Sequence, residues 1–254
     1  MTEALEVRGL TVRFGGLEAL GGVSFAVADG AITALIGPNG AGKTTCLNVL
    51  SGLQKPTAGA VRYRGRDVTA LAPHRRQYLG RTFQIVAPFD GMTVEENIQV
   101  GIEARGRIGL GRAALRVGRR RRERRSRERA AALIERMNLA PVASRLVETL
   151  PLGHQRLVEF GRALAQDPEL LLLDEAASGL SGGEMEELAG QVLRCRDEGR
   201  TVVLIEHNMR FVTRLADHLL VLDRGNLLYD GATEAGLTDP AVKAAYLGST
   251  NGAA

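Results

Sequence analysis

Hydrophobic and polar positions alternate in two short stretches near the start of the chain. In residues 10–14 and 23–27, apolar side chains recur at every second position, which is the period of a strand with one buried face. Ile32–Ile36 is instead a continuous apolar run, typical of a strand buried on both faces. Asp29 and Gly30 lie between the two kinds of pattern and indicate a turn. We therefore predict strands here, the last of them in a buried sheet.

Strand and helix patterns alternate again in the last third of the chain. Apolar runs predict buried strands at 170–173, 202–205 and 219–222. Apolar residues at helical spacing predict helices at 43–53, 183–198 and Met209–Leu215. Strands that alternate with helices favour a parallel sheet with helices on both faces. The fold class is therefore α/β.

The strand pattern disappears between about residues 88 and 165. Helical periodicity replaces it and predicts helices at 94–103, 113–137 and 154–165. We interpret 88–165 as a helical subdomain inserted into one α/β core, which residues 1–87 and 166–254 form together. The chain 1–254 is then a single domain, which its length allows.

Residues 116–129, inside this helical stretch, are dense in arginine, with two glutamates and one serine between them. A solvated helix face is the simplest interpretation. Contact with anionic lipid headgroups is the alternative, because each basic side chain near such a surface contributes about 1 kcal/mol. Nucleic acid fits less well, since no aromatic residues lie between the arginines.

The composition, with 44% hydrophobic and 24% charged residues, is that of a globular protein. Its net charge of +4 is compatible with an anionic ligand or partner. Cys46 and Cys195 lie far apart without C-x-x-C spacing, so we expect free thiols in a reducing compartment. We see neither a signal peptide nor an apolar run near the about 18 residues of a membrane span. We therefore expect a cytosolic protein that reaches any membrane through partners.

A glycine-rich segment follows the buried run Ile32–Ile36 and fits the pattern G-x-x-x-x-G-K-[ST] in full. It comprises Gly37, Pro38, Asn39, Gly40, Ala41, Gly42, Lys43 and Thr44, with Thr45 directly after it. Glycines let backbone N–H groups point at phosphate oxygens, and the helix N-terminus adds partial positive charge. We expect Lys43 to reach the β- and γ-phosphates and the Thr44 hydroxyl to ligate Mg²⁺. A chance glycine turn is the weaker alternative.

Two carboxylates end the apolar run 170–173. Asp174 can hold Mg²⁺, directly or through water. Glu175 can polarise the attacking water as a general base. An apolar strand that ends in acidic residues is common by itself, but open α/β sheets bind ligands at this end of their strands. Together with the glycine-rich segment, the pair predicts a site for nucleotide hydrolysis.

These motifs, with RTFQ at 81–84 and IEHNM at 205–209, resemble the ATP-binding subunits of ABC transporters over nearly the whole chain. The resemblance implies a P-loop NTPase (RecA-like) core, an N-terminal antiparallel β subdomain and the inserted helical subdomain. It makes Gln84 a contact of Mg²⁺ and water, and His207 a switch histidine that positions water with Glu175. It makes Phe14 the ring that stacks on adenine, with packing in the core as the alternative.

The family signature, Leu-Ser-Gly-Gly-Gln before a helix, has two candidate positions. Residues 180–184 match it best by letter but follow Asp174 and Glu175, whereas the signature precedes that pair, so we reject them. Residues 150–156, LPLGHQR, have the right position. There Pro151 replaces the serine and Leu152 the first glycine. Gly153 and the helix N-terminus remain to face a phosphate.

The chain resembles one of the two ATPase subunits of branched-chain amino acid importers in three features. They are this signature variant, the basic insertion and the segment AAYLG at 244–248. Close relatives of that subunit serve urea and amide uptake. Lipid or lipopolysaccharide export by another ABC system is an alternative. A DNA-repair or translation ABC protein is disfavoured, because we find no long coiled coil, zinc cysteines or second ATPase module.

The resemblance also implies partners and a location. Two ATPase subunits sandwich ATP and Mg²⁺ between the phosphate loop of one and the signature helix of the other. Because Pro151 removes a serine donor, we expect a heterodimer with a different ATPase subunit, with a homodimer as the alternative. Transmembrane permease subunits would dock at residues 84–91, and a substrate-binding protein would act indirectly. We expect no nucleic-acid partner and a peripheral position on the cytoplasmic face of the cell membrane.

Overall fold

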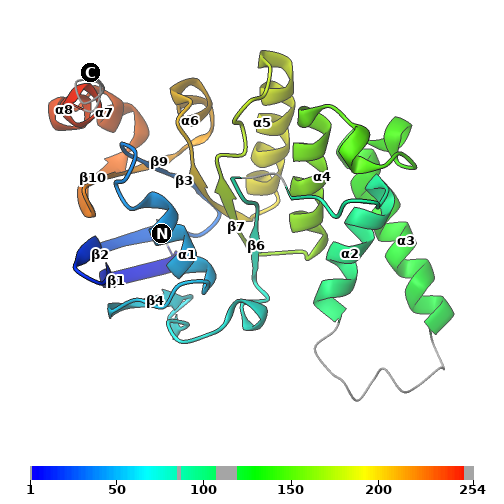
Figure 1. Cartoon of the computed structure of the whole chain (residues 1–254), viewed down its shortest axis with the longest axis horizontal. Helices are drawn as coiled ribbons and strands as arrows, with labels where there is room; N and C mark the ends of the chain where they lie inside the picture. Colours follow the sequence, from blue (N-terminus) through cyan, green and yellow to red (C-terminus); the bar gives the residue numbers. More distant parts are fainter. Residues whose placement is uncertain (1, 85–86, 107–118, 249–254) are drawn as a thin grey trace.

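The computed structural model describes residues 2–84, 87–106 and 119–248. At residues 105–106, 119–122 and 247–248 it describes the backbone alone. Two sheets and their helices form one side of the molecule, and the helices α2, α3 and α4 form the other (Figure 1). The α/β core with an antiparallel β subdomain and an inserted helical subdomain confirms the predicted fold class.

The smaller sheet is antiparallel, with the strand order β2-β1-β4-β5. Its strands are β1 (Glu3–Phe14), β2 (Leu17–Ala28), β4 (Ala58–Tyr63) and β5 (Arg66–Asp67). The strands predicted at 10–14 and 23–27 are the second parts of β1 and β2. The pairing register of β1 shifts between Val7 and Leu10, where Gly9 has a φ of 55°. This bulge interrupts the alternation of buried and exposed positions, so the pattern shows only part of the strand.

The larger sheet has the strand order β10-β9-β3-β8-β7-β6. Its strands are β3 (Ile32–Ile36), β6 (Leu79–Arg81), β7 (Leu170–Asp174), β8 (Thr201–Ile205), β9 (His218–Asp223) and β10 (Asn226–Ala232). The five strands from β9 to β6 are parallel, as predicted, and β10 adds an antiparallel edge. All residues of β3, β7 and β8 are buried, so the continuous apolar runs do mark its centre.

The two faces of this sheet pack against different layers. The helices around it are α1 (Lys43–Ser51), α4 (Leu152–Ala165), α5 (Gly182–Asp197) and α6 (Met209–Leu215). Leu35 and Leu172 pack with α1 and the smaller sheet. Ala34 and Leu171, one position earlier, pack with α4, α5 and α6. Helices therefore lie on both faces of the sheet, as predicted, and the antiparallel sheet shares one of these faces with α1.

The helical subdomain consists of α2 (Val94–Gly106), α3 (Arg119–Arg136) and α4. The second half of α3 buries Ala130 and Ile134 in the core shared with α2 and α4. In its first half the arginine side chains that the structure describes, from Arg124 onward, are exposed, and Arg124 pairs with Glu128 at 2.8 Å. Residues 116–118 of the basic run, and 113–118 of the helix predicted at 113–137, lie outside the described residues. The described part of the run is a solvated helix face.

The C-terminal helices α7 (Thr233–Thr238) and α8 (Pro240–Gly248) follow the edge strand β10. Short 3-10 turns lie at Pro73–Arg75, Ala140–Val142 and Val147–Thr149. Cys46 and Cys195 are both buried and free. Burial raises the pKa of Cys46 to about 12 and that of Cys195 to about 11, so both remain protonated thiols at neutral pH.

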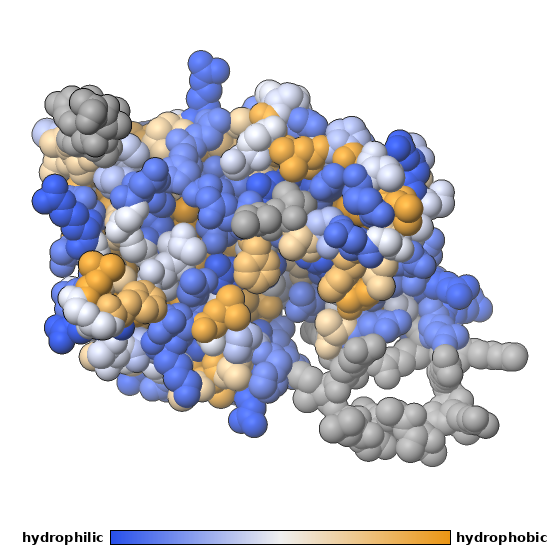
Figure 2. Space-filling view, in the orientation of Figure 1, coloured by the Kyte–Doolittle hydropathy of each residue, from blue (hydrophilic) through white to orange (hydrophobic). Residues whose placement is uncertain are grey.

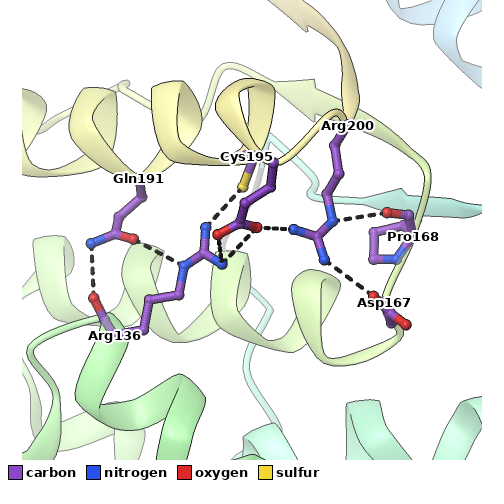
Figure 3. Close-up of polar contacts among 7 residues, drawn as sticks. Arg136, Asp167, Pro168, Gln191, Cys195 and Arg200 are labelled. Carbon is purple, nitrogen blue, oxygen red and sulfur yellow. Dashed lines mark hydrogen bonds and ion pairs between the residues drawn. The ribbon is translucent and has the colours of Figure 1, made fainter. Parts of the chain in front are cut away.

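A polar network joins the helical subdomain to the core (Figure 3). Arg136, at the end of α3, donates to both carboxylate oxygens of Glu198 at 2.7 and 2.9 Å and to the Cys195 sulfur at 3.4 Å. Gln191 of α5 returns a hydrogen bond to the Arg136 carbonyl at 2.9 Å. Arg200 contacts Glu198 from the other side. Glu198 is thus shared by two arginines, one from each part of the molecule.

No described helix is both long and apolar enough to cross a membrane. On the face drawn in Figure 2, hydrophobic side chains lie in small separate groups among hydrophilic ones. Phe83 and Phe89, which flank the start of the helical subdomain, are 42% and 45% exposed. These two rings are large apolar groups that the fold leaves in contact with solvent.

Candidate nucleotide site

The glycine-rich loop between β3 and α1 packs closely against the backbone of neighbouring segments. A Cβ atom on Gly37, whose φ is 150°, would lie 2.1 Å from the carbonyl oxygen of Leu222. A Cβ atom on Gly42, whose φ is 99°, would lie 2.5 Å from the carbonyl oxygen of Ala19. Only glycine fits at either position. Residues 39–45, from this loop and the start of α1, line a pocket, and glycine-rich loops of this kind can offer backbone N–H groups to a phosphate.

Lys43, the first residue of α1, is turned back into this loop. Its ammonium group donates to the carbonyl oxygens of Gly37 at 2.8 Å and Pro38 at 2.9 Å. Burial lowers the pKa of Lys43, while the carboxylates of Glu175 and Asp174 oppose that shift. Charged oxygens are stronger partners for an ammonium group than neutral carbonyls. Lys43 is therefore placed to bind an anion in the loop.

Asp174, the last residue of β7, is only 2% exposed. One carboxylate oxygen, Oδ2, accepts a hydrogen bond from Arg81 at 3.2 Å. The other, Oδ1, is buried and has no hydrogen-bond partner among the described residues. Burial raises the pKa of Asp174, and the Arg81 guanidinium opposes that rise. The carboxylate thus keeps one free oxygen at the end of the strand, which suits a hard divalent cation.

Glu175 lies between two side chains from distant parts of the chain. The Gln84 amide donates to Glu175 Oε2 at 2.9 Å, and His207 Nε2 lies 2.6 Å from Oε1. Glu175 has a φ of 49°, which is uncommon outside glycine, and its N–H donates to the carbonyl of Ile205. This turn carries the chain away from β7 and aims the carboxylate at the glutamine and histidine. A carboxylate held in this way can act as a general base.

Lys43, Glu175 and the two side chains that contact Glu175 line one pocket of about 390 Å³. Of the predicted residues it brings together Phe14, 39–45, Gln84, Glu175 and His207. Phe14 is half exposed and lines the pocket, so packing in the core, the alternative for this residue, does not hold. Gly37 and Pro38 hold Lys43 instead of lining the pocket. Thr44, Gln84 and the nearby Asp174 offer hydroxyl, amide and carboxylate oxygens, a donor set that fits Mg²⁺.

Gly153 does not line this pocket. It is the second residue of α4, and a Cβ atom there would lie 2.1 Å from Glu184 Oε1. Hydrogen bonds from Ser181 and a further one from the Gly153 backbone lower the pKa of Glu184. Ser181 and Glu184 form a capping box at the start of α5, so residues 180–184 start the helix that follows β7. The contact between Glu184 and Gly153 was not predicted.

Two further residues, to which the sequence analysis gave no role, support the site. Arg156 of α4 donates to the carbonyl oxygens of Phe83 at 3.1 Å and Gln84 at 2.9 Å. Glu159, one turn later, accepts from the Phe83 N–H at 2.9 Å. Both side chains are buried, and burial raises the pKa of Glu159. Two charged residues three apart on the otherwise apolar buried face of a helix are the signal that could have identified them.

Comparison with known proteins identifies the family. The family model described as "ABC transporter" matches residues 20–178. The high-affinity branched-chain amino acid transport ATP-binding protein BraF of Pseudomonas aeruginosa is 41% identical, over 96% of this chain and 97% of that protein. Its counterpart LivG of Escherichia coli K12 is 39% identical over 96% and 97%.

Solved structures of ATP-binding cassettes from ABC transporters are similar to this chain in sequence and in fold. An ATP-binding cassette of an ABC transporter in its ADP conformation is 31% identical, with a TM-score of 0.84 over 98% of this chain and all of that one. A nucleotide-free cassette is 32% identical, with a TM-score of 0.84 over 96% and 98%. The matched family region contains the phosphate loop and both carboxylates at the end of β7. The chain therefore belongs to the ABC transporter family, as one of its ATP-binding, ATP-hydrolysing subunits.

Proposed function

We propose that this subunit hydrolyses ATP in the 390 Å³ pocket, with Glu175 as the general base, to power the uptake of branched-chain amino acids. The observation that carries the catalytic part is the placement of Glu175 between Gln84 and His207, beside the phosphate loop. The names of the relatives BraF and LivG support the substrate class.

In this mechanism each part of the pocket has one role. The backbone N–H groups of the phosphate loop and Lys43 bind the phosphates, and Phe14 supports the adenine ring. Gln84 and His207 hold the Glu175 carboxylate, which accepts a proton from the attacking water. Mg²⁺, held by Thr44, Gln84 and Asp174, would neutralise charge on the phosphates.

The subunit would work as half of a pair at the cytoplasmic face of the membrane. Gly153 lies outside the chain's own nucleotide pocket, which supports a role toward ATP held by a second subunit. The absence of a serine at Pro151 favours a different ATPase subunit as that partner. The exposed rings of Phe83 and Phe89 support docking of transmembrane permease subunits at residues 84–91. A substrate-binding protein would contact the permease and not this chain.

Uptake in cells tests the substrate class. In a strain that lacks this chain, the wild type should restore uptake of radiolabelled leucine, and Lys43→Ala should not. Glu234→Gln, an exposed carboxylate on α7, serves as the matched control and should restore uptake fully. If the wild type restored urea uptake and left leucine uptake unchanged, the proposed substrate class would be wrong.

A further inference from the structure

Glu206 is a buried carboxylate that the mechanism above does not use. It follows β8 directly, precedes His207 and is only 3% exposed. Taking a carboxylate out of water is costly unless hydrogen bonds and charges compensate. The groups that contact the Glu206 carboxylate and offset this cost therefore indicate the role of Glu206.

The contacts of Glu206 reach the segments that carry the reacting groups. Its Oε1 accepts a hydrogen bond from the Ala177 N–H at 2.9 Å, two residues after Glu175. The backbone N–H of His207 lies close enough to lower the pKa of its carboxylate. The Arg156 guanidinium, which holds the Gln84 backbone, attracts it. Glu206 is thus linked to each of the segments that bring Glu175, His207 and Gln84 together.

Glu206 lies behind the site and does not face the nucleotide pocket. It lines a separate cavity of about 200 Å³, together with Glu175, Ala177 and His207. The nucleotide pocket shares Glu175 and His207 with this cavity but not Glu206. Any effect of Glu206 on hydrolysis must therefore pass through the residues that it holds.

We propose that Glu206 is a positioning residue for ATP hydrolysis, which fastens the loop after Glu175 to the His207 segment and so keeps the two side chains in contact. The proposal rests on the function proposed for Glu175. This tether, the contact between Glu206 and the loop after Glu175, would stabilise the unusual φ of Glu175. A strained backbone conformation persists only where its surroundings hold it. The hydrogen bond from the Ala177 N–H joins the loop after Glu175 to the residue directly before His207.

The tether should respond to pH near neutrality. Burial raises the pKa of Glu206 to about 7, Glu175 adds to the rise, and the N–H donors and Arg156 oppose it. The titratable and charged groups that face it are Glu175, His207 and Arg156. The ionised form accepts hydrogen bonds more strongly than the acid. The tether is therefore weak below the pKa and becomes strong as the pH rises through about 7.

The pH profile of ATP hydrolysis by the full chain tests this. For the wild type, kcat should rise across about pH 7. Glu206→Gln keeps a neutral acceptor, so it should match the wild type near pH 6 and lack the rise above it. Glu206→Ala removes the acceptor and should lower kcat about tenfold throughout. The KM for ATP should stay within about twofold in both variants, since Glu206 does not line the nucleotide pocket.

A second readout does not depend on hydrolysis. The backbone amide resonance of Ala177, whose N–H donates to Glu206 Oε1, should shift across about pH 7 in the wild type and should lose this shift in Glu206→Gln. Superimposable kcat profiles and Ala177 amide shifts in wild type and Glu206→Gln would overturn the proposal. So would a raised KM with unchanged kcat in Glu206→Ala. A wild type that hydrolyses no ATP would contradict the function proposed for Glu175, and the Ala177 amide shift would still decide on Glu206.

Discussion

At the scale of single residues, the site is built from carboxylates that the fold withdraws from water. Burial raises the pKa of Asp174, Glu159 and Glu206, and each keeps its place through a different partner. Asp174 has the Arg81 guanidinium, whereas Glu159 and Glu206 accept backbone N–H groups. Glu175 is the more accessible carboxylate, with 15% of its side chain exposed. That accessibility suits a group that must reach water.

Single residues of the site also differ in whether their roles can be predicted from the sequence. Lys43, Thr44, Asp174 and Glu175 belong to short motifs whose chemistry depends on neighbours in the chain. Arg156 donates to the Gln84 carbonyl, 72 positions away, so its role depends on a contact that local spacing does not show. The roles of Glu159 and Glu206 likewise depend on hydrogen-bond partners in other segments of the chain. Contacts of this kind depend on tertiary packing, which a single sequence does not display.

The two candidate signature segments can be separated by substitution. Gly153→Asp should nearly stop ATP hydrolysis by the assembled transporter, because a carboxylate there would repel the γ-phosphate in a poorly hydrated site. Ser181→Ala removes the N-cap of α5, which costs about 1 kcal/mol of stability, and should change the rate only modestly. Rates and melting temperatures of both variants provide the measurement.

Glu184 supplies the control for this comparison. The new side chain at position 153 would also collide with Glu184, which lies against Gly153. If phosphate repulsion causes the loss, the double variant Gly153→Asp/Glu184→Ala should stay inactive. Recovery of the rate in the double variant would assign the effect to the collision instead. A Ser181→Ala variant less active than Gly153→Asp would reverse the assignment of the signature.

At the scale of elements, the prediction succeeded where one pattern covered a whole strand or helix. Ile32–Ile36 and Met209–Leu215 were predicted with the bounds that the structure has. The strand Leu79–Arg81 was missed because three residues are too few for a period. Asn226–Ala232 was missed because it is an edge strand with no buried position, so its side chains carry little hydrophobic signal. Strands are thus predictable to the extent that burial dictates their residues.

The network around Glu198 should determine how firmly the helical subdomain is held. Glu198→Gln weakens the contacts to Arg136 and Arg200, so amides of α3 and α4 should exchange hydrogen faster. The amides of β3 in the core should be unaffected. Hydrogen exchange followed by mass spectrometry measures both.

The exposed ion pair between Arg124 and Glu128, both on α3, gives a matched control. Glu128→Gln breaks the ion pair with Arg124, whose side chain is 81% exposed, and exposed pairs contribute little to stability. Exchange in α4 should therefore match the wild type in Glu128→Gln. Equal exchange in the two variants would show that the Glu198 network does not hold the subdomain.

At the scale of the whole molecule, the chain carries a complete phosphate loop, and Pro151 and Leu152 lie in the segment that we propose as its signature. A site made from two copies would lack the serine hydroxyl toward both ATP molecules, and a lost donor to a charged group costs about 1.5–3 kcal/mol. Pairing with a subunit that has the serine would restore the donor over the ATP bound by Lys43. The pair should then contain one stronger and one weaker site.

ATPase rates of this chain alone and of the copurified pair test that asymmetry. The pair should hydrolyse ATP faster and dimerise more tightly in ATP, as measured by phosphate release and light scattering. Restoring the signature with Pro151→Ser/Leu152→Gly should move the single chain toward the pair. Equal rates and equally tight homodimers without these substitutions would favour a homodimer as the working assembly.

The role of Glu175 is tested most directly by separating ATP binding from turnover. Lys43→Ala should abolish retention on ATP-agarose, because it removes the cation from the phosphate loop. Glu175→Gln should bind ATP like the wild type and lose about 10²–10⁴-fold in phosphate release, the usual contribution of a general base. Glu234→Gln, the exposed control on α7, should match the wild type in both measurements. A Glu175→Gln protein that released phosphate at near the wild-type rate would show that Glu175 is not the base.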